Sequence, residues 1–206
     1  LAPGVGKAWR SRRDVHAWTR LLPASAFRGS FITPQARYLY GMDRGQFNVL
    51  AWESIAETVP EMEYSSSVAA LMLAQHPDAR RFLVVGPGAY TLCQALLRMP
   101  QVERVTWLHP DPEYPRRLLE ALPAELRADP GRLELPEVEV RRYLCAATEP
   151  PYDTAILALP SATTLSVNRY FTLEFYRLVR ARLADDGIIA VRVPAGENYL
   201  DGALAG

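Results

Sequence analysis

Two closely spaced glycines in the middle of the chain are the first residues whose types and spacing could hold a ligand. They are Gly86 and Gly88, which follow the apolar run Phe82 to Val85 and precede a helical pattern that begins near Thr91. A buried strand, a Gly-x-Gly turn and a helix start form the ligand-binding corner of doubly wound α/β folds, because glycine lets a ligand approach the backbone closely. Alone, the pattern is a weak predictor of binding, so the elements around it must decide its meaning.

The composition narrows the class of protein. The 206 residues contain 23 Lys and Arg and 23 Asp and Glu, and a net charge of zero argues against a dedicated nucleic-acid binder. Cys93 and Cys145 lack metal-ligand spacing and are predicted to be buried thiols, and the three scattered histidines predict no metal site. No stretch of about 20 apolar residues occurs, so no transmembrane segment is predicted.

The first residues of the chain are basic, and this charge can be explained in two ways. The chain begins at Leu1 and carries Lys7, Arg10, Arg12 and Arg13. They form either the solvated start of a helix or a juxtamembrane segment on the cytoplasmic side of a membrane region. We therefore expect a cytoplasmic domain, which in the second interpretation lies at the inner face of the membrane.

Strand and helix patterns divide the chain into three parts. Residues 1–35 form an irregular or helical lead-in, residues 36–60 a small β-meander of three strands with a turn at 42–45, and residues 61–206 an α/β domain. In the last part, five predicted strands alternate with helices, which indicates a mostly parallel sheet with right-handed crossovers. The strands are expected at 82–85, 102–108, 138–141, 152–159 and 188–193. The helices are expected at 61–75, 91–99, 111–122 and 168–183, with a short helical connector at 142–147.

Two later stretches resemble one known family. They are Tyr152 to Pro160 and Asn168 to Tyr176, followed by the turn Asp185 to Ile188. They resemble the spermidine synthase, or polyamine aminopropyltransferase, family, and the resemblance extends from about Gln46 to Tyr199. Asn168 to Thr172 is similar to the bacterial branch that is often fused to membrane segments. The resemblance implies a methyltransferase-like doubly wound, mostly parallel, Rossmann-like sheet behind a small antiparallel β-meander, with the C-terminal end of the domain incomplete.

The resemblance also implies a reaction, whose residues can be compared one by one. The family transfers an aminopropyl group from decarboxylated S-adenosylmethionine to a polyamine. Carboxylates orient these cationic substrates, take a proton from the attacking amine and balance charge. Four positions that would hold the cofactor or the polycation are uncharged in this chain: Ala89, His109, Ala158 and Ser161. Because Ala158 stands at the family's catalytic aspartate, we predict no catalytic residue.

A vestigial cofactor cleft is predicted from the residues that the resemblance leaves in place. Gly86 and Gly88 keep two glycines of the family's motif, whereas Tyr90 replaces a small glycine and could fill the cavity. Asp111 lies two residues beyond the family's ribose-binding acid, and Glu139 is retained near its adenine-binding acid. Asp111 also has a plainer role, because an acid favours the N-terminus of the helix that follows it.

Three functions stay open at this point. The first is a pseudoenzyme that binds no cofactor and serves as a structural or interaction subunit of a larger, membrane-associated protein complex, or as a homo-oligomer. The second is an active transferase that uses S-adenosylmethionine or its decarboxylated form, with Asp111 and Glu139 binding it. The third is a ligand-binding role for the old cleft. Trp9, Trp18 and Trp52 are candidates for exposed contacts with a partner, unless they pack on the β-meander.

Overall fold

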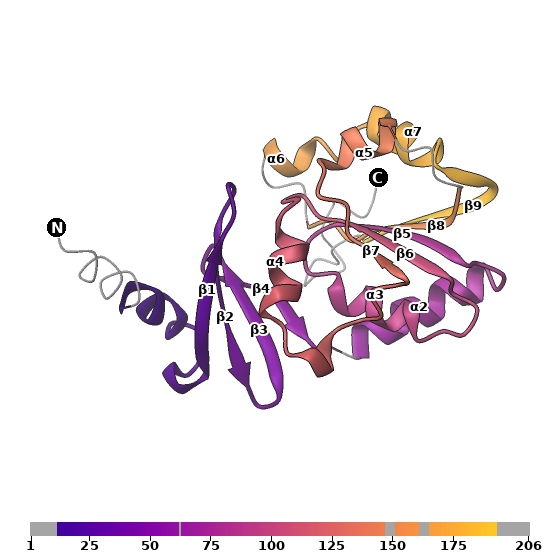
Figure 1. The fold of residues 1–206 in the computed structure, drawn as a ribbon. Helices are drawn as coiled ribbons and strands as arrows, with labels where there is room; N and C mark the ends of the chain where they lie inside the picture. The colour runs from indigo at the N-terminus through magenta and orange to yellow at the C-terminus, as the bar shows by residue number, and fades with distance from the viewer. Residues whose placement is uncertain (1–11, 62, 147–150, 161–164, 193–206) are drawn as a thin grey trace, which may run out of the picture.

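The computed structural model describes residues 12–61, 63–146, 151–160 and 165–192. A helix over residues 12–18 precedes a short 3-10 turn, η1, and a four-stranded antiparallel sheet in the order β1-β2-β3-β4 (Figure 1). The bounds are η1 Ala24–Ala26, β1 Phe27–Ile32, β2 Arg37–Asp43, β3 Gln46–Ala51 and β4 Ser54–Val59. The predicted turn between the first two strands of the meander is confirmed, because Arg44 and Gly45 link β2 to β3 with φ angles of 48° and 80°.

The N-terminal sheet has one strand more than the sequence predicted. Strand β1 lies in the stretch assigned to the lead-in, and it pairs with β2 from Phe27 opposite Gly41 to Ile32 opposite Arg37. Its sequence, FRGSFI, does not alternate cleanly between polar and apolar residues, and its register shifts between Phe27 and Gly29. Pairing with β2, rather than a pattern of its own, makes this segment a strand.

The second part alternates between strands and helices. Its parallel strands are hydrogen-bonded in the order β7-β6-β5-β8-β9, so the strand before the glycine turn lies at the centre. The strands are β5 Arg81–Val85, β6 Arg104–Leu108, β7 Leu133–Glu134, β8 Tyr152–Leu157 and β9 Leu183–Val191. The helices are α2 Glu63–Gln75, α3 Tyr90–Leu97, α4 Tyr114–Ala121, α5 Val140–Ala146, α6 Leu165–Asn168 and α7 Leu173–Arg180, with a 3-10 turn, η2, at Ala124–Leu126. The predicted α/β fold with an antiparallel sheet before it is confirmed.

The prediction of a strand at 138–141 is wrong. The edge strand β7 lies earlier and has two residues, whereas Val140 begins helix α5. Val140 and Leu144 are both buried and lie four positions apart, which places them on one face of a helix. Glu139 stabilises the start of that helix, because its Oε2 accepts a hydrogen bond from the Arg142 backbone N–H at 3.0 Å.

The last helix and strand also differ in their bounds. The helix expected over 168–183 is shortened to α7, because Thr172 is extended and its side chain accepts a hydrogen bond from the Phe175 backbone N–H as an N-cap. The short helix α6 ends at Asn168, where the expected helix begins. Strand β9 begins at Leu183, not at 188. The predicted turn at 185–187 is an irregularity inside this strand, where the partner of β8 jumps from Leu183 to Ile188.

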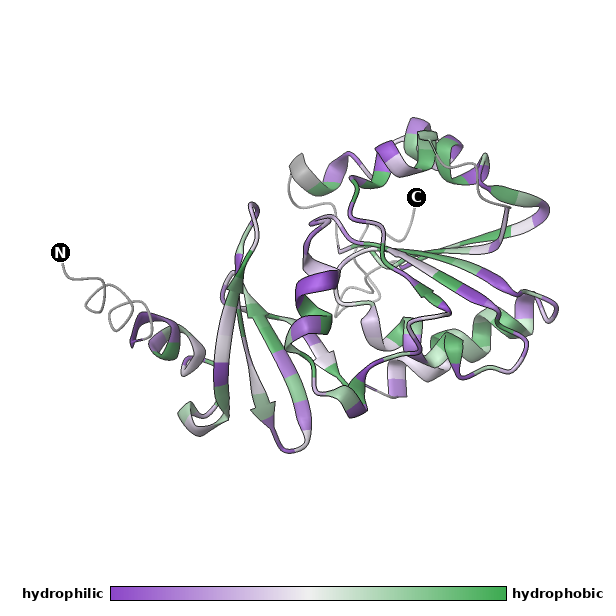
Figure 2. Cartoon of the chain, in the orientation of Figure 1, coloured by the Kyte–Doolittle hydropathy of each residue, from purple (hydrophilic) through white to green (hydrophobic). Residues whose placement is uncertain are grey.

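One hydrophobic core joins the two sheets. Helices α5 and α7 cover one face of the parallel sheet, and α2 and α3 cover the other (Figure 1). Apolar residues run along the central strands (Figure 2). The larger core cluster contains Phe47 and Val49 of the antiparallel sheet together with Phe82 and Val84 of β5. The antiparallel sheet is thus packed as part of the same body as the α/β domain.

Several smaller predictions are settled by burial. Cys93 is buried as predicted, but Cys145 is exposed near the end of α5. Trp18 is fully buried, whereas Trp52 is 79% exposed. No helix in the described ranges is long and apolar enough to cross a bilayer. Trp9 and the basic residues before residue 12 lie outside the described residues.

Candidate ligand cleft

A cleft of about 690 Å³ lies where the antiparallel sheet meets the glycine turn. Its walls come from the β3–β4 turn, strand β4, the start of α2, the turn after β5 and the end of β8. They include Ile55, Glu57, Tyr64, Gly88, Ala89 and Ala158. This is the carboxyl edge of the parallel strands, where open α/β sheets take their ligands. Of the four residues predicted to bind a cofactor, Gly88 lines this cavity.

Both glycines of the turn are required by close contacts between backbones. Gly86 has a φ of 139°, and a Cβ atom there would lie 2.2 Å from the carbonyl oxygen of Ala158. Gly88 has a φ of 65°, and its Cβ atom would lie 3.0 Å from the carbonyl oxygen of Ala56. These contacts explain why glycine is retained at both positions without any ligand. A role for Gly86 and Gly88 in cofactor binding stays a prediction.

Tyr90 occupies the interior behind the turn. Its side chain is fully buried, and its ring lies 6.0 Å from that of Trp107 on β6, measured between centroids. Its hydroxyl accepts a hydrogen bond from the Ala128 backbone N–H at 2.7 Å and donates to the carbonyl oxygen of Leu126 at 3.3 Å. Burial raises the pKa of Tyr90 to about 12, so the hydroxyl stays neutral. The ring thus packs in the core behind the cleft and holds the loop after α4.

His109 and Asp111 are both engaged inside the protein. His109 is buried and stacks on Tyr114 with ring centroids 4.4 Å apart, and burial lowers its pKa to about 4. Its neutral ring therefore carries no charge at pH 7. Asp111 is buried, and its Oδ2 accepts hydrogen bonds from the hydroxyls of Thr33 at 2.6 Å and Tyr38 at 2.8 Å. Asp111 thereby joins the α/β domain to the antiparallel sheet.

Glu139 lies apart from the cleft. It is half-exposed at the start of α5, where it stabilises the first turn and lies 3.6 Å from the Arg169 guanidinium. It is absent from the residues that line the cavity beside the glycine turn. Of the predicted site residues, the structure brings Gly88 and Ala158 together at the cleft, with Gly86 directly behind. Ser161 lies outside the described residues.

Sequence reasoning missed two acidic residues that line the cleft: Glu61, just before α2, and the more deeply buried Glu57 on β4. Glu57 is 3% exposed, its Oε1 accepts a hydrogen bond from the Tyr90 backbone N–H at 3.1 Å, and its Oε2 has no hydrogen-bond partner among the described residues. Burial raises the pKa of Glu57 to about 8, so the carboxyl is largely neutral at pH 7. A lone acid in a predicted strand was the available signal, because strands disfavour glutamate.

Comparison with solved structures defines the fold. The chain is similar in fold to spermidine synthase in complex with the transition-state analogue AdoDATO, with a TM-score of 0.63 and 20% identity over 81% of this chain and 57% of that one. It is similar to spermidine synthase from Thermotoga maritima, with a TM-score of 0.61, 19% identity and coverage of 81% and 56%. The fold is therefore that of spermidine synthase: a Rossmann-like sheet behind an antiparallel sheet.

No family model matches the chain. Its sequence is nevertheless similar to those of curated polyamine aminopropyltransferases. The chain is 28% identical over 137 residues to polyamine aminopropyltransferase 2 of Ralstonia nicotianae, covering 64% of this chain and 26% of the relative. It is 30% identical over 145 residues to the polyamine aminopropyltransferase of Mycobacterium tuberculosis, covering 66% and 27%. The chain thus spans about a quarter of the length of these relatives. Sequence and fold together support a relationship to the polyamine aminopropyltransferases.

Proposed function

We propose that this chain is an aminopropyltransferase-like domain that no longer makes polyamines and serves as a structural or interaction subunit of a larger, membrane-associated complex. One observation carries the proposal: side chains at the positions where the family binds its cofactor are used for packing. Tyr90 fills the interior behind the glycine turn, and His109 is buried under Tyr114. Asp111 is held by Thr33 and Tyr38.

The charge of the cleft supports the loss of polyamine chemistry. Ala89 and Ala158 line it without charge, and Glu57 is largely neutral because burial raises its pKa to about 8. Both carboxylate oxygens of Glu61 are engaged by the start of α2, through Tyr64 and Ser65. A polycation in this cleft would leave charges unpaired, and each such charge costs several kcal/mol.

An active transferase is the second candidate, and the open cleft favours it. A cavity of about 690 Å³ is within the usual size range for small-molecule sites, and the Oε2 atom of Glu57 is buried there without a hydrogen-bond partner. Because burial raises the pKa of Glu57 to about 8, the carboxylate that could take a proton from an acceptor amine predominates only above about pH 8. In this alternative, S-adenosylmethionine or its decarboxylated form would be the cofactor, and Asp111 would have to give up its hydrogen bonds to bind it.

Calorimetric titration separates the two candidates. The folded 206-residue chain would be titrated with S-adenosylmethionine, its decarboxylated form and methylthioadenosine. We expect no binding heat from any of them. Binding tighter than about 100 μM, which corresponds to about −5.5 kcal/mol, would support the transferase and contradict the pseudoenzyme.

A variant tests whether the Tyr90 ring is the obstacle. Tyr90→Gly removes the buried ring next to Trp107, whereas Tyr176→Gly removes a half-buried ring on α7, outside the cleft lining, and serves as the matched control. We expect Tyr90→Gly, checked for native circular dichroism, to gain affinity for methylthioadenosine while Tyr176→Gly does not.

The subunit role needs its own test. The native full-length protein should elute from size-exclusion chromatography well above its own mass and sediment with the membrane fraction. Elution of the native protein as a soluble monomer would contradict the proposed role in a complex.

A further inference from the structure

The turn between β3 and β4 has an unfavourable backbone and exposes a large aromatic side chain. Trp52 and Glu53 have φ angles of 53° and 60°, a region that bulky residues rarely adopt and that glycine or asparagine would occupy at lower cost. The Trp52 side chain is nevertheless 79% exposed, so burial does not explain it. A ligand that covers the Trp52 ring would account for a large aromatic residue on this turn.

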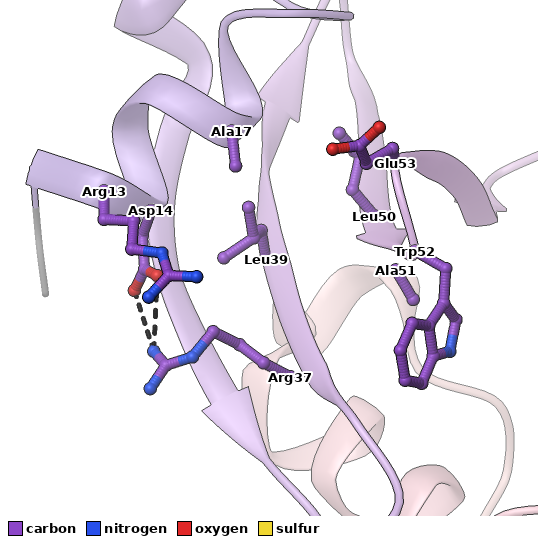
Figure 3. Close-up of a pocket in the computed structure, with 9 residues that line it drawn as sticks. All are labelled: Arg13, Asp14, Ala17, Arg37, Leu39, Leu50, Ala51, Trp52 and Glu53. Atoms are coloured by element: carbon purple, nitrogen blue, oxygen red, sulfur yellow. Dashed lines mark hydrogen bonds and ion pairs between the residues drawn. The ribbon is translucent and has the colours of Figure 1, made fainter.

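A second pocket lies beside this turn, on the N-terminal side of the molecule (Figure 3). Its volume is about 470 Å³, within the usual range for small-molecule sites. It lies between the helix over residues 12–18 and the antiparallel sheet. Ala17, Leu39 and Leu50 form its apolar wall, and Trp52 stands at one side. Apart from Ala51 and Trp52, its lining differs from that of the cleft at the glycine turn.

The opposite side of this second pocket is cationic. Figure 3 shows the guanidinium groups of Arg13 and Arg37 gathered around Asp14, across from Trp52 and Glu53. Asp14 is 8% exposed and fixes Arg37, whose Nη1 lies 2.9 Å from the Asp14 Oδ2. Asp14 pairs with Arg37, and no ion pair joins Arg13 to a carboxylate among the described residues, so the positive charge of Arg13 is left over.

The remaining donors of this side are available to a ligand. The hydrogen bonds of Arg37 to described residues all leave from Nη1, to Asp14 and to the Ser30 hydroxyl, so its Nε and Nη2 are not used by them. Guanidinium groups bind carboxylates through paired N–H donors, and an arginine already oriented by a neighbour loses less entropy on binding. Across the pocket, Glu53 pairs with Arg20 and therefore adds little uncompensated charge.

We propose that this pocket binds a small organic carboxylate with a flat apolar body. The carboxylate contacts Arg13 and Arg37, and the apolar body lies along Leu39 and Leu50 with one face against the Trp52 indole. The excess positive charge sets the preference for an anion, and the apolar wall with the exposed ring sets the preference for its body. This site is independent of the cleft at the glycine turn, and the proposal goes beyond the function proposed for that cleft.

Matched probes test the charge requirement. The 206-residue chain is titrated with 1-naphthoate and with 1-naphthamide, which has nearly the same shape and no charge. We expect saturable binding of the carboxylate, followed by calorimetry and by a change in tryptophan emission, and binding of the amide at least about tenfold weaker. Equal affinity for the two probes, or no saturable binding of the carboxylate, would overturn the proposal.

Matched variants test the location. Arg13→Gln and Trp52→Asn should each weaken naphthoate binding at least about fivefold, and both alter exposed side chains, so the fold should persist. Arg44→Gln alters an exposed arginine on the β2–β3 turn, and Ile55→Asn alters an exposed apolar residue of the other cleft. These two controls should bind as the parent does. If Arg13→Gln and Arg44→Gln bind alike, the site is not where we place it.

Discussion

At the scale of single residues, the buried carboxyl of Glu57 has the clearest consequence. Its Oε1 accepts the Tyr90 backbone N–H, and burial raises the pKa of Glu57 from 4.5 to about 8. The folded state therefore keeps a proton that the unfolded chain releases above about pH 4.5. By linkage, the contribution of Glu57 to the free energy of unfolding is full below pH 4.5 and falls as the pH rises towards 8.

His109 has the opposite effect over part of this range. Burial lowers its pKa from 6.5 to about 4, so its contribution to stability increases as the pH rises from about 4 to 6.5. Between pH 6.5 and 8 only the Glu57 effect remains of these two. We expect the free energy of unfolding to fall there by about 1.4 kcal/mol per pH unit, and Glu57→Gln to remove this slope. Urea titrations at four pH values measure it; an unchanged slope in the variant would contradict a raised pKa.

At the scale of elements, the ends of β5 and β8 meet through Gly86. A Cβ atom at this position would lie 2.2 Å from the backbone oxygen of Ala158, with a φ of 139° that disfavours any side chain. Gly86→Ala should lower the free energy of unfolding by at least about 3 kcal/mol. Gly45→Ala is the matched control, because Gly45 has a φ of 80° but no atom within 4 Å of its Cβ position, and it should cost about 1 kcal/mol. Equal losses in chemical denaturation would show that the close contact is unimportant.

The N-cap of helix α7 gives a second test at this scale. The Thr172 side chain accepts a hydrogen bond from the Phe175 backbone N–H at 3.2 Å. Thr172→Ala should therefore lower the free energy of unfolding by about 1 kcal/mol. Ser67→Ala on α2 removes an exposed hydroxyl that donates within its own helix, and it should change stability by less than about 0.5 kcal/mol. Equal effects of the two substitutions would argue against the cap.

The same elements show what the sequence could and could not predict. Strands β5, β6 and β8 are mostly apolar and are bounded by breakers, so their positions were predictable. Strand β1 was not, because its pairing with β2 determines it. Only the start of helix α5 was mistaken for a strand: Val140 was placed in the strand expected at 138–141, whereas the connector at 142–147 was expected to be helical.

The candidate site was only partly predictable, for a related reason. Loss of charge at Ala89 and Ala158 is visible in the sequence, and so is the bulk of Tyr90. The engagement of Asp111 by Thr33 and Tyr38 depends on how the two sheets pack, and no local pattern encodes that contact. Glu139 was placed in the strand expected at 138–141. It lies away from the cleft because this stretch leads into helix α5 instead.

At the scale of the whole molecule, Asp111 joins the two sheets. Asp111→Ala leaves the buried hydroxyls of Thr33 and Tyr38 without their acceptor, so we expect the free energy of unfolding to fall by roughly 2–5 kcal/mol. Hydrogen exchange should accelerate at the amides of β2 more than at those of β5. Asp43→Ala, at the end of β2, is the control and should change stability by less than about 0.5 kcal/mol. Uniform acceleration in both sheets would mean that Asp111 does not hold them together.

The aromatic side chains that pack between the antiparallel sheet and the α/β domain have a consequence for synthesis on the ribosome. Tyr38 of β2 is stacked with Phe31 and lies 4.7 Å from the ring of Tyr114, measured between centroids, while its hydroxyl reaches Asp111 73 positions further along the chain. The hairpins of the antiparallel sheet are local and can form as soon as they emerge. Translation adds about 5–20 residues per second, so the segment that covers their aromatic face is synthesised about 4–15 seconds later. During that interval the aromatic side chains of the nascent antiparallel sheet are exposed to solvent. We expect chaperones that bind exposed aromatic residues to bind the nascent chain at this sheet.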